Sequence, residues 1–151
     1  MRVRAATAAD GEFIAELCNR FAECELPPWR TAAEVNGGTA WRMTQALATA
    51  DDRSQVVVAE DAGGTRLGFA WFHVIDDFYD GGPVAKLSEI AVVRDGTGAG
   101  AALMEAAEGF ARRHGCDSIV LNVLEGNARA RRFYRKHGFE PEYTQMVKPL
   151  V

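Results

Sequence analysis

A chain of 151 residues has the length of one ordinary domain, and its 48% hydrophobic and 25% charged residues are typical of a soluble globular protein. The net charge of -4 argues against a nucleic-acid surface spread over the whole molecule. No run of about eighteen apolar residues and no apolar N-terminal signal segment occurs. We therefore expect one domain over residues 1–151, in the cytoplasm, with no membrane and no nucleic acid as partner.

The first part of the chain predicts a strand and two helices. Residues 2–6 alternate briefly between apolar and polar side chains, which is typical of a strand. An amphipathic helix is expected next, and Pro27 would end it. Its apolar positions recur at helical spacing: Phe13, Ile14, Leu17, Cys18, Phe21 and Cys24. Residues 26–38 are expected to form an irregular connection, followed by a shorter helix over residues 39–50 in which Trp41 packs.

The middle of the chain predicts an antiparallel hairpin. Residues 55–60 and 67–75 are rich in β-branched and aromatic side chains, and the turn sequence at residues 61–64 separates them. Residues 76–83 are acidic and aromatic and contain glycines, so they are expected to form a loop. A further strand is expected over residues 86–93.

The last third of the chain alternates helices with strands. After the strand at residues 86–93, an alanine-rich helix is expected to run to Gly115, and residues 118–124 have the pattern of a buried strand. Asn127 would cap a last helix that ends at Gly138. Two short strands are expected to finish the chain, residues 139–143 and 145–150. This order predicts an α/β fold, a mixed sheet with helices on its faces and a crossover helix between two parallel strands.

The junction after the strand at residues 86–93 has the composition of a phosphate-binding turn. Gly96, Gly98 and Gly100 lie between an apolar strand and the start of a helix. Glycines let the backbone approach a ligand closely, and the free N–H groups of a helix's first turn attract anions. The sequence therefore predicts a phosphate-bearing ligand at this turn.

Three classes of phosphate ligand use such turns. A P-loop nucleotide site needs a lysine and a hydroxyl residue after its last glycine, but Ala101 and Ala102 stand there. A dinucleotide fingerprint fits residues 96–101, with Glu125 at the end of the next strand. Glu125 is far from the glycines, however, and too little chain remains for a second half of such a domain, so this interpretation ranks third.

Two motifs between residues 87 and 139 favour the third class, an acyl-coenzyme A. The first is Glu89-Ile-Ala-Val-Val93 followed by Gly96-Thr-Gly98-Ala-Gly100-Ala-Ala-Leu103. The second comprises Leu121-Asn-Val123, Asn127, Ala130, Phe133-Tyr134 and Gly138-Phe139. In this order and at this separation they resemble the two coenzyme A motifs of the GNAT superfamily of N-acetyltransferases. The resemblance implies a twisted mixed sheet of about six to seven strands with helices on both faces.

The resemblance also implies acetyl-CoA as the acyl donor. Its pyrophosphate would contact backbone amides of the glycine turn. Its pantetheine arm would enter between the strands that end near Val92 and begin near Ser118, which part from each other in the family. The implied coenzyme-binding residues are Ala91, Val92, Val93, Arg94, Gly96, Thr97, Gly98, Ala99, Gly100 and Ala101 in the first motif and Asn127, Ala130, Phe133 and Tyr134 in the second.

One position departs from the family pattern. The family usually places Arg or Gln where this chain has Asp95, and Arg94 stands just before it. An acid that points at a pyrophosphate is unfavourable. Asp95 is therefore expected to face solvent, while the backbone amides of residues 96–101 and the side chain of Arg94 supply the positive potential.

Two residues are implied as catalytic groups. Tyr134 stands at the family position that approaches the coenzyme sulfur, where its phenol could protonate the departing thiolate. It could instead only pack, because it lies beside Phe133 on the apolar face of its helix. Glu89 lies in an apolar strand, where burial would raise its pKa and suit it to take a proton from an ammonium, directly or through water. Because strand residues alternate, Glu89 could also face solvent as an ordinary surface charge.

The acceptor pocket is expected to come from variable loops, with Trp29, His73 and Asp77 as the substrate-binding candidates. The carboxylates of Asp76, Asp77 and Asp80 would attract a cationic amine, or they could be solvated loop charges. His73 could reach the acceptor groove from the hairpin or be a structural histidine. The histidines of the chain lack the spacing of metal ligands, so no metal is expected.

The basic run in the last predicted helix has two interpretations. It consists of Arg129, Arg131, Arg132, Arg135 and Lys136. Taken alone, such a run could indicate a nucleic-acid patch. Beside a coenzyme site, an exposed face with one or two side chains near the nucleotide phosphate is the more economical interpretation.

The sequence therefore predicts an N-acetyltransferase that moves an acetyl group from acetyl-CoA to a primary amine of a small molecule or protein. Neither motif places a cysteine to carry the acyl group, so direct attack in a ternary complex is expected. The alternative is a non-catalytic acyl-CoA-binding or sensing domain, which would keep the glycine turn and lose the acid and base. Dimers are common in the family, which implies a homodimer.

Overall fold

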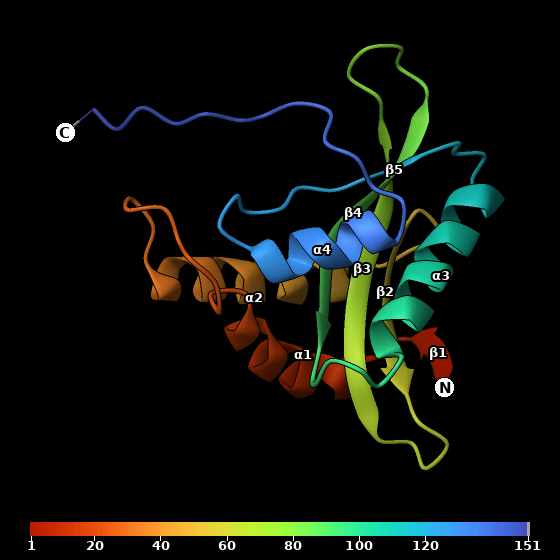
Figure 1. Ribbon diagram of the computed structural model, residues 1–151. Coiled ribbons are helices and arrows are strands. Elements are labelled where there is room, and N and C mark those ends of the chain that lie inside the picture. Colours follow the sequence, from red (N-terminus) through yellow and green to blue (C-terminus); the bar gives the residue numbers. More distant parts are fainter. Residues whose placement is uncertain (151) are drawn as a thin grey trace.

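Within residues 1–150, which the computed structural model describes, five strands form one mixed sheet (Figure 1). Their order in the sheet is their order in the chain: β1 (Arg2–Ala5), β2 (Ser54–Glu60), β3 (Arg66–Asp76), β4 (Pro83–Val92) and β5 (Ile119–Val120). The first four strands pair antiparallel, and β5 pairs parallel with β4. The predicted mixed sheet is confirmed, with fewer strands than the expected number of about six to seven.

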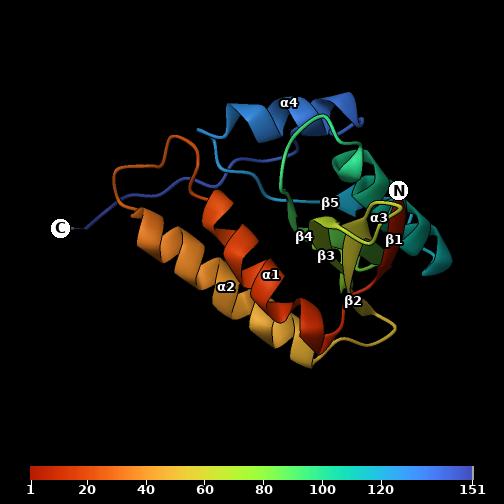
Figure 2. The same cartoon turned by 90° about the horizontal axis from the view of Figure 1, so that it is seen from below.

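Helices cover both faces of the sheet, as the element order predicted (Figure 2). The α-helices of residues 1–150 are α1 (Gly11–Leu17), α2 (Ala32–Ala48), α3 (Ala99–Arg113) and α4 (Ala128–Lys136), and short 3₁₀ turns, Ala8–Asp10 and Cys18–Arg20, flank α1. Helices α1 and α2 lie on one face, and α3 lies on the other. No helix in these residues is long and apolar enough to cross a membrane.

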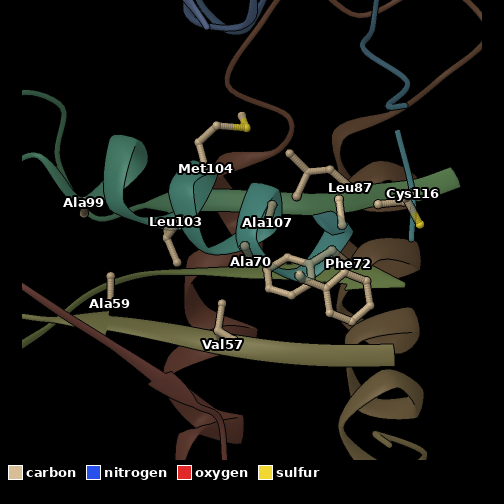
Figure 3. Close-up of a cluster of buried hydrophobic side chains, with 13 residues drawn as sticks. Val57, Ala59, Ala70, Phe72, Leu87, Ala99, Leu103, Met104, Ala107 and Cys116 are labelled. Carbon is tan, nitrogen blue, oxygen red and sulfur yellow. The ribbon is translucent and has the colours of Figure 1, made fainter. Parts of the chain in front are cut away.

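Alternating side chains along the strands fill a core layer on each face of the sheet. Toward α3, the layer consists of Val57, Ala59, Ala70, Phe72 and Leu87, packed against Leu103, Met104 and Ala107 of the helix (Figure 3). Toward α1 and α2, it consists of Val56, Val58 and Phe69, packed against Ile14, Leu17, Cys18, Met43 and Ala46. Both layers are almost completely closed to solvent, so the sheet is a rigid support for the loops at its ends.

The second helix begins earlier than the sequence pattern suggested. We expected an irregular connection as far as residue 38, but Thr31 starts α2 with a capping box. The N–H of Glu34 donates to Oγ1 of Thr31 (3.1 Å), and the N–H of Thr31 donates to Oε2 of Glu34 (2.9 Å). The packing predicted for Trp41 is wrong, because its side chain is 66% exposed and α2 buries Met43 and Ala46 instead.

The two strands predicted for residues 139–143 and 145–150 are absent. Residues 140–150 are extended, exposed and without a hydrogen bond among the residues described, and they run away from the sheet (Figure 1). Pro141 and Pro149 lack the N–H group that a ladder requires. The strand predicted over residues 118–124 is also reduced, to the two residues of β5.

An extra residue in β4 opens the sheet beside β5. Glu89 lies opposite Trp71 and Leu87 lies opposite Phe72, so Ser88 is the additional residue of a β-bulge. Strand β5 pairs with β4 only at Ala85 and Lys86. Beyond Lys86 the two strands separate, as the family pattern implied, and the second half of β4 has a free edge.

Candidate active site

A cleft of about 740 Å³ lies along the free edge of β4. Strand β4 and the turn after it form one wall, residues 122–124 and α4 form the second, and α2 with the segment before it forms the third. The predicted coenzyme-binding residues that line it are Ala91, Val92, Arg94, Gly96, Thr97, Gly98, Gly100, Ala101, Asn127, Ala130, Phe133 and Tyr134. Two of the predicted residues, Val93 and Ala99, do not line the cleft.

The glycine turn has the backbone geometry that an anion site needs. Gly96 (φ 80°) and Gly98 (φ 85°) are both in the left-handed region, which glycine adopts without a steric penalty. Gly98 caps α3, so the free N–H groups of the first helical turn lie at the end of the helix that borders the cleft. The side chain of Ala99 is buried in the core beneath the turn, and its N–H donates to Oγ1 of Thr97 (3.3 Å).

Helix α4 packs closely over this turn. A Cβ on Gly100 would lie 3.1 Å from the ring of Phe133, so Gly100 lets α3 and α4 approach each other. Asn127 caps α4, because its Oδ1 accepts from the N–H of Ala130 (3.1 Å). The two motifs, separate in the sequence, therefore meet at one end of the cleft.

Asp95 is exposed to solvent, as expected, but it also lines the cleft. Its carboxylate pairs with Arg129 of α4 (3.3 Å), and both side chains are more than half exposed. Of the basic run in α4, Arg129 and Lys136 line the cleft. Together with Arg94, they place positive charge at the turn end of the cleft, where Asp95 removes only part of it.

Glu89 does not face solvent. It is 9% exposed and forms an ion pair with Arg42 of α2 (2.7 Å between Oε1 and a guanidinium nitrogen). Burial raises the pKa of Glu89 to about 7, against the positive charges of Arg42 and Lys86, which lower it. A carboxyl group with this pKa exchanges a proton readily near neutral pH.

Tyr134 both packs and lines the cleft. Its ring makes edge contacts with Phe133 (centroids 5.5 Å apart) and Phe139 (5.8 Å), and it faces the cleft from α4. Burial raises the pKa of Tyr134 to about 12, and the negative charge of Glu89 adds to the effect. The phenol therefore keeps its proton at neutral pH and can donate it.

Arg42 and Arg20 are cleft residues that the sequence pattern did not indicate. Arg42 lies in the segment that was expected to be an ordinary short helix, and its guanidinium also lies over the ring of Trp71 (5.7 Å). Arg20 donates to the carbonyl oxygens of Val92 and Val93, the latter at 3.0 Å, at the end of β4. Only the pairing of distant elements reveals either contact.

The three acceptor candidates lie outside the lining of the cleft. Trp29 is 43% exposed in the segment before α2. His73 stacks on Trp71 (5.0 Å) and forms a hydrogen bond with Oγ of Ser88 (2.8 Å), on the α2 face of the sheet. Asp77 accepts from the N–H groups of Tyr79 and Asp80, which fixes the turn between β3 and β4.

Two loops meet next to residues that line the cleft, Leu124 and Asn127. A Cβ on Gly126, which precedes α4, would overlap the backbone carbonyl of Glu25, which precedes α2. Only a glycine fits this contact between the two segments. The segment after α1 therefore contacts the segment after β5, although the sequence places them a hundred residues apart (Glu25 and Gly126).

The comparisons with known proteins agree with this arrangement. The model of the acetyltransferase (GNAT) family matches residues 14–139. An uncharacterized N-acetyltransferase of Bacillus subtilis (strain 168) is 25% identical over 144 residues, which cover 94% of this chain and 91% of that protein.

Two solved structures show the same fold. A tetramutant of the BH1408 protein from Bacillus halodurans superposes with a TM-score of 0.80 at 24% identity, over 99% of this chain and 100% of that chain. A putative acetyl transferase from Pyrococcus furiosus superposes with a TM-score of 0.75, also at 24% identity, over 99% and 100%.

Proposed function

Because this chain belongs to the GNAT family of acetyltransferases, we propose that it is an N-acetyltransferase that transfers an acetyl group from acetyl-CoA to a primary amine. The observation that supports this most is the meeting of Glu89 and Tyr134 at one cleft, whose far end is the glycine turn. A group that accepts a proton near neutral pH and a group that donates one are the two that such a transfer needs.

The residues present fit acetyl-CoA. The glycine turn and the first N–H groups of α3 would hold its pyrophosphate, with Arg94, Arg129 and Lys136 nearby. The N–H of Val93 donates across the sheet to Leu67 (2.8 Å), so the backbone groups of Val92 face the other way, along the free edge. When bound, acetyl-CoA would supply the thioester carbonyl that the amine attacks, and the N–H of Val92 would be its hydrogen-bond donor.

Glu89 and Tyr134 would manage the protons of the reaction. Glu89 would take the proton that an ammonium must lose before its nitrogen can attack. Tyr134 would give its phenolic proton to the sulfur as the carbon–sulfur bond breaks and the carbon–nitrogen bond forms. The second proton that the nitrogen loses on becoming an amide would return to the phenolate of Tyr134. Arg42 would hold the carboxylate of Glu89 in place between these events.

The burial of the cysteines supports direct transfer of the acetyl group to the amine. Cys18 is buried in the core behind the cleft, and burial raises the pKa of its thiol to about 11, with Glu89 adding to the effect. Burial also raises the pKa of Cys24 and of Cys116. Because none of these thiols lines the cleft, we propose that the amine attacks within a ternary complex.

Calorimetry and a thiol-release assay test the proposal together. Titration with acetyl-CoA should show binding, and a panel of primary amines should release free coenzyme A thiol. Glu89→Gln and Tyr134→Phe should each lower kcat by about 100-fold or more and leave acetyl-CoA binding in place. No binding at millimolar acetyl-CoA would refute the proposal. Binding without turnover of any amine would favour the non-catalytic acyl-CoA-binding domain.

A further inference from the structure

The part of the cleft formed by α2, the segment before it and β4 as far as Glu89 carries more positive than negative charge. Its basic side chains are Arg20, Arg30, Arg42 and Lys86, and its carboxylates are Glu34 and Glu89. The loop carboxylates Asp76, Asp77 and Asp80, which were expected to attract a cationic amine, lie outside the lining. The charge of the cleft wall is thus the opposite of what a simple cation-binding groove requires.

Both carboxylates of this wall are already engaged. Glu89 pairs with Arg42, and Glu34 accepts from the N–H of Thr31 in the capping box. Arg20 pairs with Glu23 (3.1 Å) and donates to the carbonyls at the end of β4. Among residues 1–150, no carboxylate lies within 4.0 Å of the charged groups of Arg30 and Lys86. These two cations therefore have no ion-pair partner among these residues.

Lys86 is the more informative of the two cations because it is half-buried. Burial lowers its pKa and the neighbouring charge of Arg42 lowers it further, and together they outweigh the charge of Glu89, which raises it. Lys86 lies beside His73 in the strand register, on the face of the sheet that Arg42 covers. Burying a cation without a direct ion-pair partner costs free energy. A ligand that brings a negative charge would offset this cost.

The phosphates of the coenzyme are not the matching charge. The turn that would bind them lies beyond the other end of β4, and Lys86 is roughly 20 Å from Val92 at about 3.3 Å per residue of strand. Other basic residues, Arg94, Arg129 and Lys136, already line the cleft at that turn. Lys86 and Arg42 are instead the neighbours of Glu89, where an acceptor amine would lie.

We propose that the acceptor is a small amine that also carries an anionic group, a carboxylate or a phosphate, and that Lys86 and Arg42 bind this group. The amine would then face Glu89. The single negative charge of Glu89 cannot balance the positive charges of both Lys86 and Arg42. Arg30, on the exposed rim, would attract the anion from solution. This inference rests on the proposed N-acetyltransferase function and specifies its substrate class.

Matched acceptors test the inference. An ω-amino acid is compared with its carboxamide, so that the basicity of the distant amine differs little, and an amino-sugar phosphate is compared with the free amino sugar, by thiol release above the pH at which Glu89 titrates. The ratio of kcat/KM between the anionic and neutral member should exceed about 10 in the wild type, since a hydrogen bond to a charged group contributes about 1.5–3 kcal/mol. The pair in which the anionic member is preferred identifies the anionic group as a carboxylate or a phosphate.

Variants of Lys86 show whether the preference comes from this residue. Lys86→Met should bring the ratio close to 1, and Lys86→Arg should keep most of it. Because Lys86 also lowers the pKa of Glu89, either variant can change absolute rates, but the ratio within a pair is free of that effect. A wild-type ratio near or below 1, or a ratio unchanged in Lys86→Met, would overturn the inference and leave the acetyltransferase proposal intact.

If no amine in the panel is turned over, a binding measurement tells whether the inferred acceptor class or the proposed acetyltransferase function has failed. The same matched ligands are then titrated into the protein saturated with coenzyme A. Tighter binding of the anionic member in the wild type, lost in Lys86→Met, supports the inference even if catalysis fails. Equal binding of the two members, or no binding of any anionic amine, overturns it. Absence of acetyl-CoA binding counts against the proposed function alone.

Discussion

At the scale of single residues, the protonation of Glu89 depends on two opposed effects. Burial favours the neutral carboxylic acid, whereas the positive charges of Arg42 and Lys86 favour the carboxylate. Burial has the larger effect, so the pKa lies near 7 in spite of an ion pair at 2.7 Å. A pKa near 7 brings no advantage to a carboxylate with only a structural role, whereas a general base works best when its pKa is close to the working pH.

The first prediction concerns the pH dependence of the reaction. A base must be deprotonated to act, so kcat/KM should rise with pH and level off above a midpoint near 7. Arg42 lowers the pKa of Glu89, so Arg42→Ala should move this midpoint to a pH higher by about 1 or more. Initial rates of thiol release from pH 5 to 10 measure it. Glu89→Gln should remove the dependence.

A matched arginine serves as the control for this prediction. Arg112 also forms an ion pair, with Glu108 (2.9 Å), but on the exposed face of α3 and outside the cleft. Arg112→Ala should leave the midpoint where it is in the wild type. A midpoint that stays near 7 in Arg42→Ala would mean that another group, not Glu89, gives rise to the pH dependence.

The sequence indicated Glu89 and Tyr134 but not Arg42, which forms the ion pair with Glu89. Glu89 and Tyr134 stand in motifs whose context is local, within a few residues along the chain. Arg42 reaches Glu89 only because α2 begins at Ala32 and crosses the α1 face of the sheet. The burial of Glu89 likewise depends on the cover that α2 provides, which no periodicity in residues 86–93 reveals.

At the scale of elements, the turn between β4 and α3 combines two demands on glycine. Gly96 and Gly98 need a left-handed backbone, whereas Gly100 needs room for Phe133. The sequence predicted the cluster, its place before a helix and its anion-binding role. It could not tell which glycine serves the backbone and which serves the packing of α4, because that depends on a helix that begins only at Ala128.

The second prediction separates these demands. Gly98→Val should weaken acetyl-CoA binding and lower the free energy of unfolding by about 1–2 kcal/mol, because a side chain at φ 85° is strained. Gly109→Ala is the control within the same helix, since its Cβ would meet only the flexible guanidinium of Arg113 (3.2 Å). That variant should gain up to about 1 kcal/mol and bind normally. Urea unfolding and calorimetry measure both, and normal affinity in Gly98→Val would exclude the turn from the site.

The third prediction concerns the contact between the loops of Gly126 and Glu25. Gly126→Ala places a Cβ where the carbonyl of Glu25 lies, so the contact must open. Neither residue lines the cleft that holds the proposed catalytic pair, and we expect kcat to change less than 3-fold while KM for the acceptor rises several-fold. Steady-state kinetics at saturating acetyl-CoA measure the two constants separately. An unchanged KM would show that this contact does not shape the acceptor end of the cleft.

At the scale of the whole molecule, the expected sheet was larger than the one observed. The mixed sheet, its parallel pair and the cover of helices on both faces were predictable, because hydrophobic periodicity reports burial. The last two strands were not, since a strand needs a partner edge as well as a suitable pattern. In residues 140–150 the pattern is present without the partner, and Tyr143 (69% exposed), Met146 (89%) and Leu150 (88%) lie in solvent.

The last prediction follows from this unpartnered segment. Most residues of the predicted strand 118–124 pair with no neighbouring strand. Their free backbone N–H and C=O groups can pair readily with a further strand. The expected homodimer would bring the C-terminal segment of a second copy to this edge. Light scattering after size exclusion should then show a dimer for the full chain and a monomer when residues 140–151 are deleted. Because residues 140–150 make no hydrogen bond among the residues described, the deletion should leave the unfolding temperature of the monomer measured at low concentration nearly unchanged. A full chain that stays monomeric at 100 μM, or a deletion that stays dimeric, would contradict this arrangement.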